Sequence, residues 1–90
     1  MTPTDERPCI RVTAAELGEK IRRVQQGESA EAVNGTLGGP PFNEEEVSGM
    51  KRMFWRFCVG DAEAKREWED IYLGEFVDGR LVFGSIIPHG

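Results

Sequence analysis

The stretch "MKRMFWRFCVGD", from Met50 to Asp61, decides how the rest of the sequence is expected to fold. It places three cations among three aromatic residues in a chain that is acidic as a whole. Apolar residues in and just before it recur at i, i+3, i+7, i+10 and i+11, which predicts one wide apolar face on an α-helix. These residues are Val47, Met50, Phe54, Phe57 and Cys58.

The flanking residues set the ends of this helix and start another. Asn43, followed three residues later by Glu46, has the pattern of a helix N-cap, so the helix is expected to begin at Asn43 and end at Gly60. Asp61 then caps a third helix, whose buried stripe would contain Ala64, Trp68, Ile71 and Tyr72.

The first 30 residues predict a strand followed by a helix. "PCIRVT" alternates apolar and polar residues, as a short strand does. Thr13 and Glu16 form a capping box for a helix over "TAAELGEKIRRVQQG", with Gly27 as its left-handed terminal residue. The strand, the "TAAEL" helix and the Gly27-Glu28 turn locally resemble the N-terminal piece of Phd/YefM-type antitoxins. That family continues into a β-hairpin, whereas this sequence continues into Gly-Gly-Pro-Pro.

Two further signals complete the expected fold. Residues 34–41 read as a Gly/Pro-rich loop, preceded by at most one helical turn over residues 29–33. Asp78-Gly79 predicts a hairpin with a two-residue type I′ turn, which sets Val77 opposite Arg80, Phe76 opposite Leu81 and Gly74 opposite Phe83. The predicted fold class is α+β, with three helices packed on a three-stranded, mainly antiparallel sheet made of the N-terminal strand and this hairpin.

Composition indicates one small domain spanning residues 1–90, with residues 1–7 as a frayed terminus. The uninterrupted apolar runs are far shorter than the ~20 residues that cross a bilayer, and no secretory signal is visible, so the expectation is a cytoplasmic protein without a membrane segment. Cys9 and Cys58 are expected to be buried and reduced, although a disulfide is possible if the first strand lies on the Cys58 element. With one histidine and no C-x-x-C pair, no metal site or cofactor is predicted.

The candidate binding residues follow from charge. The net charge is −5, and residues 61–90 carry seven acidic and three basic residues. On the expected third helix, Glu63, Glu67 and Asp70 would form a row of carboxylates, continued by Glu75 and Asp78 on the hairpin. Such a row is either a solvated surface or an acidic patch for a basic partner.

A second set of candidates lies on the opening stretch. Arg52 and Arg56 would form a short cationic stripe, with Trp55 beside it. Trp55 is either a tryptophan covered by the hairpin or by the glycine–proline loop, or a partly exposed anchor of the type enriched in interfaces.

Three functions are compatible with these residues. The favoured hypothesis is a small acidic protein-binding module, monomeric or homodimeric, that acts as an inhibitor or adaptor on a basic surface of a nucleic-acid-handling protein. Several phage-encoded inhibitors, including anti-CRISPR proteins, have this size and charge. The alternative is an antitoxin-like or transcriptional regulator that binds DNA as a dimer, which the net charge of −5 disfavours, as it does any direct nucleic-acid contact. A small enzyme is the third, disfavoured because no catalytic residues converge.

Overall fold

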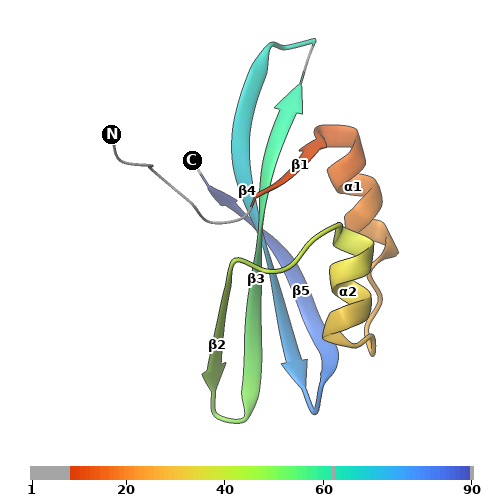
Figure 1. Ribbon diagram of the computed structural model, residues 1–90, viewed down its shortest axis with the longest axis vertical. Helices are drawn as coiled ribbons and strands as arrows, with labels where there is room; N and C mark the ends of the chain where they lie inside the picture. The colour runs from red at the N-terminus through yellow and green to blue at the C-terminus, as the bar shows by residue number, and fades with distance from the viewer. Residues whose placement is uncertain (1–8, 62, 90) are drawn as a thin grey trace.

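The structure, a computed structural model, describes residues 9–61 and 63–89 and contains two helices and five strands (Figure 1). The predicted frayed terminus, residues 1–7, lies outside the described residues. In chain order the elements are β1 (Ile10–Thr13), α1 (Ala14–Arg23), α2 (Ala30–Leu37), β2 (Asn43–Val47), β3 (Met50–Asp61), β4 (Arg66–Val77) and β5 (Arg80–His89).

The five strands form one mixed sheet in the order β1-β3-β4-β5, with β2 also paired to β3. β1 runs parallel to β3, with Ile10 opposite Phe57, whereas every other pair is antiparallel. β2 pairs with the first half of β3, up to Phe54, and β1 pairs with the second half, from Phe57. β1 and β2 therefore occupy successive parts of the long strand β3.

The expected fold class is wrong, because both helices predicted between Asn43 and Tyr72 are strands. The period that matters in β3 is two: Met53, Trp55, Phe57 and Val59 are all buried, while the residues between them are only partly buried. β-branched and aromatic residues favour this extended conformation, and pairing on both sides of β3 stabilises it. The sheet consequently has five strands instead of three, and two helices cover it instead of three.

Two hairpins with two-residue turns connect these strands. The predicted turn at Asp78-Gly79 is confirmed: both residues have positive φ, and Val77 faces Arg80 across it. The expected register fails farther along, because a bulge places Gly74 opposite Gly84 and not opposite Phe83. Ser48-Gly49 makes the other turn, also with two positive φ angles, inside the region assigned to a helix.

The N-terminal part follows the predicted order of strand and helix, but α1 ends at Arg23 with the extended Val24 as its C-cap, so Gly27 is not the terminal residue of the helix as predicted. The Thr13 hydroxyl accepts from the Glu16 N–H and the Glu16 carboxylate accepts from the Thr13 N–H, which confirms the capping box of α1. α2 is longer than the single turn expected: it begins after its N-cap Ser29 and continues through residues 34–37, which were assigned to the loop. It ends at Gly38, which is left-handed.

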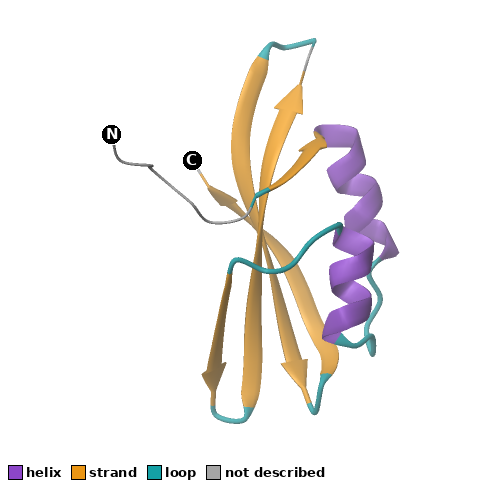
Figure 2. Ribbon diagram, in the orientation of Figure 1, coloured by secondary structure: helices purple, strands orange, loops and turns teal. Residues whose placement is uncertain are grey.

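Both helices lie on one side of the sheet (Figure 2). The core between them and the strands is built around the fully buried Trp55, together with Phe57, Val59, Val33 and Leu37. Among the described residues, neither helix is both long and apolar enough to cross a membrane.

Candidate protein-binding face

The other side of the sheet carries no helix (Figure 2), and we call it the open face. Side chains alternate along a strand, so the residues that lie between the buried ones point to this face. On β3 they include Arg52, Phe54 and Arg56, and the register brings them opposite Glu75, Leu73 and Ile71 of β4.

Apolar side chains form a band across the open face. The band consists of Phe54, Ile71, Leu73, Phe83 and Ile87. Leu73 lies between Phe54 and Ser85, and Ile71 lies between Arg56 and Ile87, so neighbouring strands contribute adjacent side chains. Phe83 is 49% exposed and Ile87 is 41% exposed, while the other three are half-buried. An exposed apolar patch with polar margins is typical of a surface that binds another protein.

Ion pairs across the strands border this band. The Arg52 guanidinium lies 3.1 Å from the Glu75 carboxylate and 3.5 Å from that of Glu45, which connects β2, β3 and β4. On the other side of Phe54, Arg56 donates to the Glu69 carboxylate. Such partly exposed pairs contribute little to stability, about 0–1 kcal/mol each, but they leave charged groups of both signs at the margin of the apolar band.

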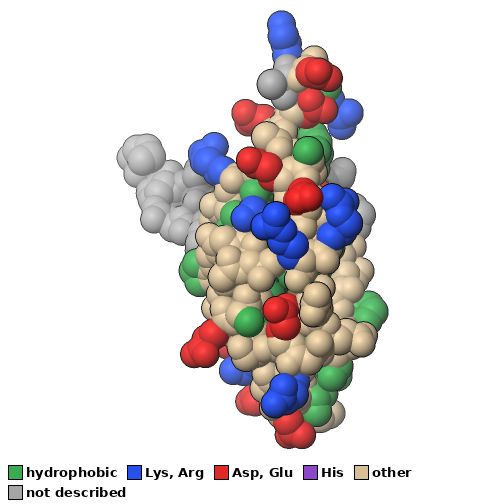
Figure 3. Space-filling view, turned by 90° about the vertical axis from the view of Figure 1, so that its right-hand side faces the viewer, with side chains coloured by type: hydrophobic (Ala, Val, Ile, Leu, Met, Phe, Trp, Pro, Cys, Tyr) green, Lys and Arg blue, Asp and Glu red, His purple; other side chains and the backbone are tan. Residues whose placement is uncertain are grey.

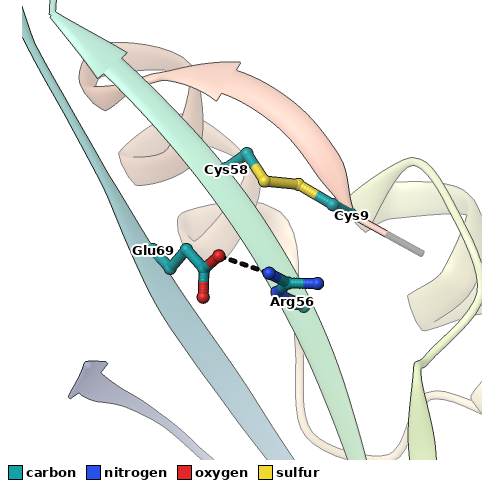
Figure 4. The surroundings of a disulfide bond; sticks show 4 residues. All are labelled: Cys9, Arg56, Cys58 and Glu69. Carbon is teal, nitrogen blue, oxygen red and sulfur yellow. Dashed lines mark hydrogen bonds and ion pairs between the residues drawn. A yellow bond between two sulfur atoms is a disulfide. The ribbon is translucent and has the colours of Figure 1, made fainter. Parts of the chain in front are cut away.

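A disulfide joins Cys9 to Cys58 beside the Arg56–Glu69 pair (Figure 4). Their Cα atoms are 5.8 Å apart, within the usual range for a disulfide. The prediction of two buried, reduced thiols is therefore wrong on both counts, because each residue is also only half-buried. The pairing follows from β1 running parallel to β3, which places Arg11 opposite Cys58 and Cys9 close by.

The predicted row of carboxylates does not form, because its helix is a strand and a turn. Glu63 lies in the turn between β3 and β4, where the Asp61 carboxylate accepts from the N–H groups of Glu63 and Ala64. Glu67 and Asp70 lie on β4 three residues apart and so point to opposite faces. The Asp70 carboxylate accepts from the Trp68 indole, 3.0 Å away.

The remaining predicted residues are also separated. Glu75 reaches the open face and pairs with Arg52, while Asp78 lies at the tip of the β4–β5 hairpin. Trp55 points the other way: it is 0% exposed and donates to Asn34 Oδ1 at 2.9 Å and to the Gly39 carbonyl at 3.1 Å. A partner cannot reach it without unfolding the core, so the covered alternative holds and the glycine–proline loop supplies part of the cover.

Sequence reasoning missed the apolar band itself. The sequence prediction places Phe83 in the hairpin and Phe54 on the buried face of a helix. The signal that separates the two faces is an alternation of side chains along residues 53–59. Met53, Trp55, Phe57 and Val59 lie on one face, with Phe54 and Arg56 between them on the other.

The excess of acidic over basic residues lies in the part of the chain that forms β2 to β5. Residues 43–89 contain ten acidic and six basic residues, whereas residues 9–42 contain four of each. The β3–β4 turn projects from the body of the molecule and carries charges of both signs, as does the side that the helices cover (Figure 3). Within the described part of the chain, no group of three His, Cys, Asp or Glu side chains is arranged to hold a metal ion.

No protein family, curated protein or solved structure matched this chain.

Proposed function

We propose that this protein is a small protein-binding module that acts as an inhibitor or adaptor, and that it docks through the open face on a basic surface of a nucleic-acid-handling protein. The observation that carries the proposal is the open face itself. It combines a band of apolar side chains with a margin in which three carboxylates, those of Glu45, Glu69 and Glu75, pair with the guanidinium groups of Arg52 and Arg56.

The two parts of this surface have different roles in binding. The apolar band supplies the area whose removal from water stabilises a complex, roughly 25 cal/mol per Å². Glu45 and Glu75 lie at the margin, where charges mainly raise the association rate and select a partner of opposite sign. Inhibitors of the phage-encoded type, including anti-CRISPR proteins, are the class we favour, since they are small acidic proteins that bind such partners.

The alternative of a DNA-binding regulator has lost its structural basis. It required a basic edge on a second helix, but Arg52 and Arg56 lie on a strand and face carboxylates of neighbouring strands. No other observation favours it.

A matched pair of variants tests the proposal. Leu73→Arg places a cation in the apolar band, and Ala15→Arg places one on exposed α1, on the far side of the sheet. Proteins retained by the immobilised wild type are compared with those retained by each variant at low and high salt. Each retained nucleic-acid-handling protein is then assayed for nucleic-acid binding with and without this chain.

The expected result is a partner that is lost with Leu73→Arg and kept with Ala15→Arg, that is released by salt, and whose nucleic-acid binding falls when this chain is added. If every retained protein binds both variants equally, the open face is not the docking surface. If a face-dependent partner binds nucleic acid equally well with and without this chain, the inhibitor proposal is wrong.

A further inference from the structure

The outer edges of the sheet differ in how well they are protected from pairing with another strand. β2 carries the three consecutive exposed glutamates Glu44, Glu45 and Glu46, and the Glu44 N–H is held by the Asn43 side chain at 3.0 Å. β5, at the opposite edge, has no charged residue from Leu81 to Pro88. Natural proteins usually block an edge strand with charges, so an uncharged apolar edge favours pairing.

The free part of β5 is short and has defined ends. At one end Leu81 donates to the Glu28 carbonyl at 2.9 Å and accepts from the Gly27 N–H at 2.8 Å. At the other end Pro88 has no N–H to donate. Between them, in the part of the chain that the structure describes, residues 83–87 have no backbone partner on their outer side.

The ladder with β4 fixes which backbone groups of this segment point outward. In an antiparallel pair, alternate residues turn their N–H and C=O groups toward the neighbouring strand. The backbone N–H and C=O groups of Leu81 point outward. The bulge after Leu81 shifts the alternation by one residue, so the next residues whose backbone groups point outward are Gly84 and Ile86. Ser85 lies between them, at the centre of the free segment.

We propose that two copies of this chain form a homodimer by antiparallel pairing of their β5 strands about a twofold axis at Ser85. In this register Gly84 of each copy exchanges hydrogen bonds with Ile86 of the other. Phe83 of each copy then lies opposite Ile87 of the other, in a pair without backbone hydrogen bonds, where side chains approach most closely.

The side chains of β5 are self-complementary in this arrangement. Phe83 and Ile87 are 49% and 41% exposed, and they lie two residues on either side of Ser85 on the same face. The twofold axis therefore places Phe83 of one copy against Ile87 of the other. No charge lies at the seam, although each copy carries a net charge of −5. The dimer is a ten-stranded sheet whose two open faces are continuous, and it does not depend on the partner proposed above.

The size of the seam sets the expected strength. Five paired residues from each copy bury less surface than the roughly 1,600 Å² of a standard interface, so the dimer is expected to exchange with the monomer. Sedimentation velocity from about 10 μM to about 1 mM covers dissociation constants in the range expected for a weak complex.

The twofold axis makes a charge-swap experiment decisive, because residue 85 of one copy lies opposite residue 85 of the other copy. Ser85→Lys and Ser85→Glu are each expected to be monomeric through like-charge repulsion, and an equimolar mixture of the two is expected to dimerise again. Val47→Lys is the matched control, because Val47 is 41% exposed and lies on the open face on β2, away from β5, so a cation there should leave the dimer intact. In the wild type, amide exchange at Gly84 and Ile86 should slow as concentration rises.

Other outcomes overturn the proposal. A wild type that is monomeric at about 1 mM has no dimer in the relevant range. A dimer that survives Ser85→Lys but is lost with Val47→Lys packs through the open faces and not through β5. A mixture of the two Ser85 variants that stays monomeric, while circular dichroism shows both folded, contradicts the twofold axis at Ser85.

Discussion

Replacing Trp55 by Phe tests the central assignment of the core. The indole N–H of Trp55 is shared between Asn34 Oδ1 and the Gly39 carbonyl, and phenylalanine supplies no donor. Two half-buried acceptors would then lose their partner, which costs about 1–3 kcal/mol. The smaller ring also leaves space in a fully buried site, which we expect to cost about 1–2 kcal/mol more.

The sum, about 2–5 kcal/mol, is a large part of the stability of a chain this size. At roughly 0.05–0.15 kcal/mol per residue, a 90-residue protein has a free energy of unfolding of about 5–13 kcal/mol. Urea unfolding followed by far-ultraviolet circular dichroism measures the change without relying on tryptophan fluorescence.

The protein contains its own control in Trp68. That side chain is half-buried, donates to Asp70 and lies 5.6 Å from the Arg66 guanidinium, so Trp68→Phe should cost about 1 kcal/mol or less. An exposed interface anchor at position 55 would also cost little. Equal losses of stability for the two variants would therefore refute the buried assignment of Trp55.

Three other predictions concern the pH dependence, the disulfide and the packing of β5. Burial, and next the Glu28 carboxylate, raise the pKa of Tyr72 above its ordinary 10.0, so the contribution of Tyr72 to stability should be level below about pH 10 and be lost as pH rises through the folded-state pKa. Ultraviolet titration of this single tyrosine should show Glu28→Gln lowering the pKa, and an unchanged titration curve would contradict the effect of the Glu28 charge on Tyr72. Denatured, unreduced protein should show no free thiol, and reducing Cys9–Cys58 should cost about 2–4 kcal/mol in urea unfolding. Gly84→Ala should cost about 1–3 kcal/mol in the same assay, because the added Cβ would lie 2.0 Å from the Tyr72 hydroxyl; a stability equal to the wild type would show that Tyr72 can move away.

Features of the fold that depend only on residues close together in the sequence could be predicted. The capping box of Thr13 and Glu16 and the turn at Asp78-Gly79 each involve residues within one turn, and both were predicted correctly. The sequence failed where two periods fit the same residues. Met50, Phe54 and Phe57 match a helical spacing, yet Phe54 and Phe57 point to opposite faces of the sheet.

The candidate binding face could not be derived without the sheet order. Its apolar band joins residues of β3, β4 and β5, and which strand lies beside which depends on pairing between distant segments. Besides the alternation along residues 53–59, Ser48-Gly49 is a local signal against the helix, because a two-residue turn with positive φ angles interrupts any helix through residues 43–60. The sequence does show the excess of acidic residues in 61–90. The predicted row of carboxylates, however, required a helix, and residues 66–77 form the strand β4.

The position of β1 has a consequence for the order in which the chain folds. β2–β3, β3–β4 and β4–β5 join neighbours in the sequence, so their hairpins can form within microseconds. Ile10, in contrast, pairs with Phe57, and this contact requires a long loop to close. During synthesis β1 and α1 leave the ribosome well before β3 exists, at about 5–20 residues per second, so the amino-terminal strand must wait seconds for the strand it pairs with. Docking of β1, followed by oxidation of Cys9 and Cys58, is therefore expected to be the last step of folding.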